Sequence, residues 1–197
     1  MQKLITILIF MLLSTNTLTA WELDKKVKKD EGGFWGAHYD IPKLLILGTV
    51  GVAGYEGTKS RMGKTAWQSL DAGIMSQLLT EGAKKIAGRN RPREAETSSE
   101  WQEGGASFFS GHVSGTTALV TPFILEYQEE YPLTHLLWAL PLHQMVGRVK
   151  AQAHWQSDVI VGALVGFASG YWATKRETPL ILYFDSDKVV VGLKHQF

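Results

Sequence analysis

A histidine and an aspartate lie four residues apart just before a long apolar stretch. They are His154 and Asp158, and Arg148 precedes the histidine by six residues. Residues four apart share a face of a helix or helical turn, so the carboxylate is placed to fix the orientation and tautomer of the imidazole. We interpret His154 as a candidate nucleophile or base. The guanidinium of Arg148 has a planar fork that matches the oxygens of a phosphate group.

Two further segments carry complementary chemistry. Lys84 and Arg91 add two cations, and Ser110, Gly111 and His112 stand at the start of an expected helix. A hydroxyl and a backbone N–H at a helix N-terminus bind anions, and His112 is then available as a general acid. Taken singly, each segment has a plainer interpretation as solvated charges, a helix cap or a structural pair. Together they supply the charge neutralisation, nucleophile and proton donor that phosphoryl transfer requires.

Other composition features exclude several kinds of site. The chain has no cysteine, which excludes disulfides, thiolate chemistry and Cys-type zinc sites. It shows no acidic cluster or histidine pair with metal-site spacing, so we expect no metal and no cofactor. A formal net charge of +1 gives no argument for a nucleic-acid partner. The remaining histidines match no element of the site and are interpreted as surface or core residues: His38, His135, His143 and His195.

Helical periodicity predicts an all-α bundle that positions these segments. The expected helices cover residues 41–57, 63–88, 110–127, 132–148 and 157–176. Gly88 is the expected end of the second helix, and Ser110 and Ser157 are the expected N-caps of the third and fifth. Pro141 predicts a bend in the fourth. Between the second and third helices, residues 89–107 form a polar loop. The apolar first and last helices are interpreted as buried, with membrane-spanning helices as the alternative.

The two ends of the chain differ from this helical middle. Residues 1–20 combine an early lysine, a short apolar run and small polar residues, which predicts a secretory signal peptide, with an uncleaved anchor as the alternative. Residues 21–40 are charged and are expected at the surface. At the other end, residues 179–197 predict a short β-hairpin with a turn at 185–188. We therefore expect a single domain, 21–197, exported to the bacterial periplasm or envelope.

The three segments resemble the type 2 phosphatidic acid phosphatase (PAP2) superfamily, which also contains bacterial non-specific acid phosphatases and vanadium haloperoxidases. That family's pattern is K-x6-R-P, then P-S-G-H, then S-R-x5-H-x3-D. The resemblance covers residues 63–175 and matches the first motif fully. Phe109 stands in place of the Pro, and Gly147 stands in place of the second Ser. Neither replaced position supplies a charge or a proton, so we expect catalysis to be retained.

The resemblance implies a role for each site residue. By similarity, His154 attacks phosphorus and forms a phosphohistidine, Asp158 holds it in the reactive tautomer, and His112 protonates the leaving oxygen. The phosphate oxygens are bound, also by similarity, by Lys84, Arg91, Arg148, Ser110 and the Gly111 amide. The expected activity is metal-independent hydrolysis of a phosphomonoester or lipid phosphate, with association with the membrane left open.

Substrate and activity leave alternatives. The loop 93–107 is acidic, which disfavours polyanionic substrates. Trp101 within this loop and Phe108 and Phe109 just after it are candidates for contact with an apolar substrate group. A vanadate-dependent haloperoxidase would use the same residues, although the short chain and simple loop argue against it. A non-catalytic phosphate-binding protein is a second alternative. The terminal Phe197 after an alternating strand suggests a third, an outer-membrane-associated protein.

Overall fold

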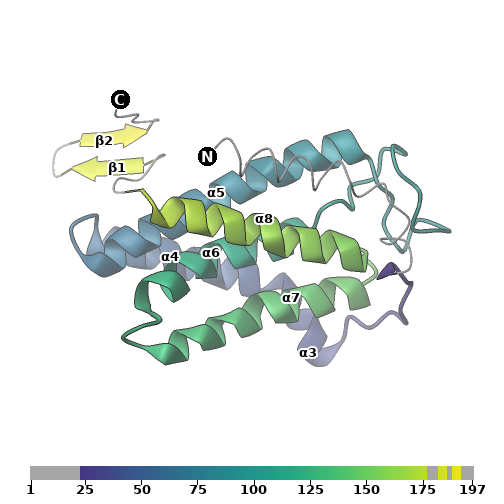
Figure 1. Cartoon of the computed structure of the whole chain (residues 1–197), viewed down its shortest axis with the longest axis horizontal. Coiled ribbons are helices and arrows are strands. Elements are labelled where there is room, and N and C mark those ends of the chain that lie inside the picture. Colours follow the sequence, from purple (N-terminus) through teal and green to yellow (C-terminus); the bar gives the residue numbers. More distant parts are fainter. Residues whose placement is uncertain (1–22, 177–181, 186–187, 192–197) are drawn as a thin grey trace.

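A computed structural model describes residues 23–176, 182–185 and 188–191. The core is the all-α bundle that the sequence predicts, with its long helices running side by side (Figure 1). Helix α6 packs against both α5 and α8. The main helices are α4 (Ile41–Glu56), α5 (Arg61–Ala87), α6 (Gly111–Tyr127), α7 (Ala139–Lys150) and α8 (Gln156–Thr174).

Both ends of α5 are set by short-range hydrogen bonds. At its start, the hydroxyl of Ser60 accepts the N–H of Gly63 at 2.9 Å, which is an ordinary N-cap. At its end, Gly88 adopts a left-handed φ of 52° and donates its N–H to the Lys84 carbonyl. A β-carbon at Gly88 would lie 3.0 Å from the Cα of Gln102, so glycine is the residue that fits this turn. The predicted end at Gly88 is confirmed, and the turn leads the chain directly into the loop with the arginines.

Glycines on α8 bring its start close to the start of α6. A β-carbon at Gly162 would lie 2.8 Å from the carbonyl oxygen of Ser110, and one at Gly166 would lie 2.3 Å from that of Ser114. Real β-carbons do not approach backbone oxygens that closely, so larger residues would push the two helices apart. Because Ser110 is the N-cap of α6, this packing places the start of α6 beside the second turn of α8.

The fourth predicted helix is two elements. Residues Pro132–Trp138 form a 3₁₀-helix, η2, and α7 begins only at Ala139. Pro141 therefore lies in the first turn of α7, where its missing N–H has no intrahelical partner to lose, and not at a bend within one long helix.

The predicted cap of α8 is also wrong. The helix begins at Gln156 with Trp155 as its N-cap, so Ser157 already lies within the first turn. The reason is that the Asp158 carboxylate reaches back to accept the N–H of Trp155 at 2.9 Å.

The segment before α4 is not simply a surface segment. It contains a short helix, α3 (Gly33–Gly36), and a 3₁₀ turn, η1 (Ala37–Tyr39), both packed beside α7. Asp24 and His38 are buried, with 8% and 0% of the whole residue exposed, backbone included. The segment therefore contributes to the interior at one end of the bundle, where it appears in purple in Figure 1.

Two short strands follow the helices. They are β1 (Leu182–Asp185) and β2 (Lys188–Val191), which pair antiparallel. Residues 186–187 of the predicted turn lie outside the described residues, as do residues 1–20 of the predicted signal peptide. The hairpin and the signal peptide therefore stay predictions.

Large apolar side chains are exposed on several helices. Leu47 on α4 is 70% exposed, Leu78 on α5 is 67% exposed and Leu164 on α8 is 59% exposed. Within the described part of the chain, none of the helices combines the length and the hydropathy needed to cross a bilayer.

Candidate active site

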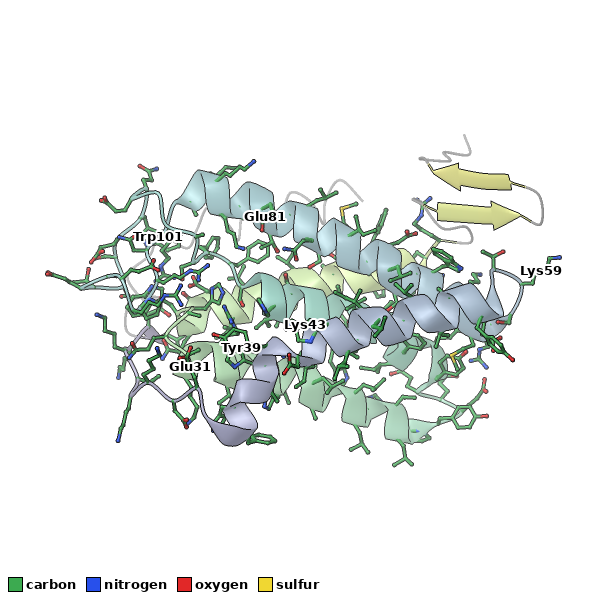
Figure 2. All side chains as sticks on the ribbon, turned by 180° about the vertical axis from the view of Figure 1, so that it is seen from behind. Glu31, Tyr39, Lys43, Lys59, Glu81 and Trp101 are labelled. Atoms are coloured by element: carbon green, nitrogen blue, oxygen red, sulfur yellow. The ribbon has the colours of Figure 1, made fainter. Side chains whose placement is uncertain are left out.

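The predicted site residues come together at one end of the bundle. Figure 2 shows Tyr39 and Trp101 at this end, whereas Lys59 lies at the opposite end. Lys84 and Arg148 lie in the last turns of α5 and α7, Arg91 and His154 in the loops after them, Ser110, Gly111 and His112 at the start of α6, and Asp158 in the first turn of α8.

The orientation of His154 is set by a backbone carbonyl. Its ring is 2% exposed, and Nδ1 lies 2.7 Å from the carbonyl oxygen of Ser107. A carbonyl only accepts hydrogen bonds, so Nδ1 carries the hydrogen and Nε2 keeps its lone pair. The nearest oxygen of Asp158 lies 3.9 Å from Nδ1, which is too far for a hydrogen bond. The predicted direct contact is absent because His154 lies in the loop before α8, where helical spacing does not apply.

Asp158 instead acts on Ser107. Its buried carboxylate accepts hydrogen bonds from Arg89 Nη1 at 2.6 Å, from the Trp155 backbone and from the Ser107 hydroxyl. Burial raises the pKa of Asp158, while the Arg89 charge and these donors counter the rise. Since the carbonyl of the same Ser107 accepts from His154, the aspartate is connected to His154 through one intermediate residue.

Arg148 offers an unused donor to the site. It is 5% exposed, and its Nε is buried without a partner among the described residues. Burial lowers the pKa of its guanidinium, which nevertheless stays protonated at neutral pH. A buried donor without an acceptor costs stability, and a phosphate oxygen is an acceptor that would remove that cost. Lys84 adds a second cation. It is half-buried, and its Nζ lies 3.2 Å from Glu81 Oε1.

The start of α6 provides uncharged donors. Ser110 is the N-cap, as predicted, but its buried hydroxyl makes no capping bond and has no partner within the described residues. The first N–H groups of a helix, here from Gly111 onward, have no intrahelical acceptor and attract anions. The N–H of Ser110 itself donates to the Asp158 carbonyl at 3.1 Å, which joins this anion site to α8.

Both histidines are neutral near pH 7 when no anion is bound. Burial and then the charge of Arg148 lower the pKa of His112 to about 4. The same two causes hold the pKa of His154 well below its usual range. A neutral His154 is what a nucleophile requires. An anion bound among the cations would counter their effect on His112 and raise its pKa, which favours its protonated form at the moment a proton donor is needed.

The space beside these groups is largely apolar. A cavity of about 430 Å³ lies among α4, α5 and α6, and Lys84, Gly111 and His112 contribute to its wall. The apolar part of the wall is formed by Pro42, Ile46, Leu70, Ile74 and Leu119. The cavity therefore offers a charged region and an apolar groove to one ligand.

The aromatic residues before α6 do not serve the predicted purpose. Phe108 and Phe109 are buried with Val165 in the core, with exposed fractions of 6% and 2%. Trp101 packs on Phe108 and on the guanidinium of Arg89, 4.4 Å from its ring centre. These residues are core, and the apolar groove is lined by other helices.

His38, which was expected at the surface or in the core, is a core residue, and its position explains one departure from the family motif. A β-carbon at Gly147 would lie 2.9 Å from the Cβ of His38, so the space of the family's serine is filled by this imidazole. His38 is fully buried, with Nδ1 at 2.6 Å from the Trp35 carbonyl. The replacement at Gly147 was a signal that another side chain occupies the position, but it did not say which one.

Potential metal ligands are not clustered. In residues 23–176 and the two strands, no group of three or more His, Cys, Asp or Glu side chains is arranged to hold a metal ion.

Three known proteins or families are similar to this chain in sequence or fold. The model of the PAP2 superfamily matches residues 66–179. A curated lipid A 1-phosphatase from Porphyromonas gingivalis is 30% identical over 137 residues, which cover 67% of this chain and 28% of the relative. The chain thus spans little more than a quarter of that relative's length. The crystal structure of Aquifex aeolicus LpxE matches 73% of this chain and 84% of its own with a TM-score of 0.57 at 20% identity, which shows a shared fold.

Proposed function

This chain belongs to the PAP2 superfamily, and on that premise we propose that it is a metal-independent phosphatase of a lipid phosphate monoester. One observation carries the choice of a lipid: the cavity that contains Lys84 and His112 is otherwise lined mainly by apolar side chains of α4, α5 and α6. A phosphate at the charged end and an acyl chain along the groove would satisfy both parts of the wall.

The reaction uses two histidines in sequence. Nε2 of His154 attacks phosphorus, the bond from phosphorus to the leaving oxygen breaks, and protonated His112 gives its proton to that oxygen. The products of this step are an alcohol and a phosphohistidine. Neutral His112 then takes a proton from water as the water attacks phosphorus, which releases phosphate and restores both imidazoles.

The cations stabilise the charge that moves during this transfer. Lys84, Arg91 and Arg148 surround His112 and His154 closely enough to lower the pKa of both. Their charges and the N–H groups at the start of α6 are in place before the substrate arrives, so little reorganisation accompanies the reaction.

The groove opens toward a lipid surface in this proposal. Ile46 and Ile74 line the groove and are also 49% and 39% exposed. Exposed apolar residues at the groove would contact the acyl chains around the substrate, and the name of the curated relative supports a lipid substrate. We propose the bacterial envelope as the location, on the strength of the predicted signal peptide.

Phosphate release in EDTA tests the proposal. The purified chain would be given a diacyl lipid phosphate in mixed micelles or p-nitrophenyl phosphate, and we expect release from both with a higher kcat/KM for the lipid. His154→Ala should abolish release, whereas His135→Ala, an exposed histidine on η2, should not. Release from neither substrate by the folded protein would contradict the proposal. Halide oxidation by peroxide after addition of vanadate would favour the haloperoxidase alternative.

A further inference from the structure

A chain of buried ion pairs connects the N-terminal segment to the site. Nη1 of Arg89 lies 2.6 Å from Asp158 Oδ1, and Nη2 lies 2.6 Å from Asp24 Oδ2. The three side chains are at most 2% exposed. The planar guanidinium of Arg89 therefore joins the carboxylate of Asp24, near the start of the described chain, to the carboxylate of Asp158 in α8.

Asp24 also holds the start of α8 directly. Its Oδ1 accepts the backbone N–H of Ser157 at 2.8 Å, and its Oδ2 accepts the Ser157 hydroxyl at 2.7 Å. A negative charge at this position satisfies an unpaired donor of the first turn and complements the helix dipole. Asp24 thus fixes the end of the loop that carries His154.

The neighbouring residues bind the rest of that loop. We define the N-terminal strap as residues 24–30, which run along residues 150–157. The backbone and side-chain contacts are Lys25 N to Gln156 Oε1 at 3.0 Å, Gln156 Nε2 to Lys25 O at 2.9 Å, Gln152 Nε2 to Val27 O at 2.7 Å and Asp30 N to Lys150 O at 3.0 Å. His154 lies within this stretch, so its backbone is held by the strap and its ring by Ser107.

We propose that Asp24 and Arg89 are positioning residues for the nucleophile, which makes the strap part of the catalytic unit. They hold Asp158 in place, Asp158 holds the Ser107 hydroxyl, and the Ser107 carbonyl selects the Nδ1–H tautomer of His154. The inference rests on the proposed function in that it takes His154 as the nucleophile.

Charge balance gives the physical reason. Without Arg89, two buried carboxylates lose their shared cation, and one of them takes up a proton because burial disfavours its charge. A protonated Asp158 is a weaker acceptor for Ser107. Without the charge of Asp24, Nη2 of the guanidinium keeps only the uncharged carbonyl of Ser98 as its acceptor, and the N–H of Ser157 loses its charged acceptor. Either change leaves the His154 ring less firmly oriented.

The experiment combines the tautomer with kinetics in the full chain. Long-range ¹H–¹⁵N spectra report which ring nitrogen of His154 carries hydrogen, and we expect the Nδ1–H form in the wild type. Asp24→Asn and Arg89→Met should give mixed tautomers and a kcat lowered by about tenfold or more at little changed KM, since small misplacements of a nucleophile are costly. Arg93→Met and Asp40→Asn, which change exposed residues, are the matched controls.

The conservative variants separate positioning from a merely structural role. Arg89→Lys keeps the charge but reaches only one carboxylate at a time, so kcat should recover in part. Asp24→Asn keeps the shape of the cap and is the variant to use if Arg89→Met does not fold. An unchanged tautomer and an unchanged kcat per folded molecule, with only a lower Tm, would overturn the proposal. The spectrum needs no substrate. If the wild type hydrolysed neither substrate, the proposed function would be contradicted, and the tautomer of His154 in the variants would still decide whether Asp24 and Arg89 position this ring.

Discussion

His154 donates its Nδ1 hydrogen to the carbonyl of Ser107 at 2.7 Å, while the nearest oxygen of Asp158 lies 3.9 Å away from that nitrogen. The tautomer of His154 is therefore set by the main chain. Asp158 acts on His154 only indirectly. Its carboxylate accepts a hydrogen bond from the Ser107 hydroxyl and forms an ion pair with Arg89.

Asp158→Asn should lower kcat far less than it would if Asp158 were hydrogen-bonded directly to His154. Where an aspartate alone sets the tautomer, its replacement by asparagine costs about 10⁴-fold in kcat. Here the Ser107 carbonyl remains, so we expect a loss of about 10²-fold or less, measured on p-nitrophenyl phosphate. A loss near 10⁴-fold in a folded variant would show that Asp158 contacts His154 during the reaction.

Asp158→Ala should strongly lower the stability of the folded protein. It removes one of two carboxylates from Arg89 and leaves a buried guanidinium incompletely paired, for which we expect a loss of about 3–5 kcal/mol in the free energy of unfolding. Urea denaturation measures this loss. Glu94→Ala removes an exposed partner of Arg93, in the loop that also contains Arg89. This change should lower the free energy of unfolding much less. Equal losses in the two variants would contradict the buried pairing.

His112→Asn should discriminate between leaving groups. An alkoxide leaves poorly without a proton, so hydrolysis of a lipid phosphate should fall by about 10²–10⁴-fold. The p-nitrophenolate ion leaves without protonation, and hydrolysis of its ester should fall much less. Steady-state kcat values for both substrates test this, with His135→Asn as control. Equal losses for both esters would exclude His112 as the proton donor.

The low pKa of His112 predicts a stability that depends on pH. Its pKa is about 4 in the folded protein and about 6.5 in an unfolded chain. Between these values the unfolded chain binds more protons, so the stability that is present above pH 6.5 is lost as the pH falls toward 4. We expect Tm to drop over this range, to drop less in His112→Asn, and to recover with added phosphate. Identical curves for both proteins would contradict this.

Filling the groove should harm lipid hydrolysis selectively. Gly115 lies one helical turn after His112, lines the groove, and has its nearest neighbour, Gln77 Oε1, 4.0 Å from a built β-carbon. Gly115→Leu therefore fits and occupies the groove, which should lower kcat/KM for the lipid phosphate by about tenfold or more. Hydrolysis of p-nitrophenyl phosphate should change little. Gly82→Leu, an exposed helical position on α5, is the matched control.

Some features of the site followed from residue type and spacing. The three motif segments carry groups whose chemistry is local, and helix ends at Gly88 and Ser110 were readable because caps depend on neighbouring residues. The lengths of the helices then placed all three segments at one end of the bundle. The PAP2 resemblance was confirmed by the family match over residues 66–179.

Other features depend on contacts between distant residues. The pairing of Asp24 with Arg89 spans 65 residues, and nothing near Asp24 in the sequence indicates burial. The Ser107 carbonyl is a backbone group, so no residue type announces its role. The groove is lined by three helices, and its shape follows from how they pack, which periodicity does not specify. The aromatic residues Phe108 and Phe109 looked available only because their burial depends on Val165 of α8.

Trapping the covalent intermediate tests the central claim most directly. The purified chain would be mixed with ³²P-labelled lipid phosphate in EDTA, quenched in alkali, which preserves phosphohistidine, and digested to locate the label. We predict an acid-labile label on the peptide that contains His154, formed fast enough to account for turnover and absent in His154→Ala. Turnover by the wild type with no label at His154, or turnover that persists in His154→Ala, would contradict the role assigned to this histidine.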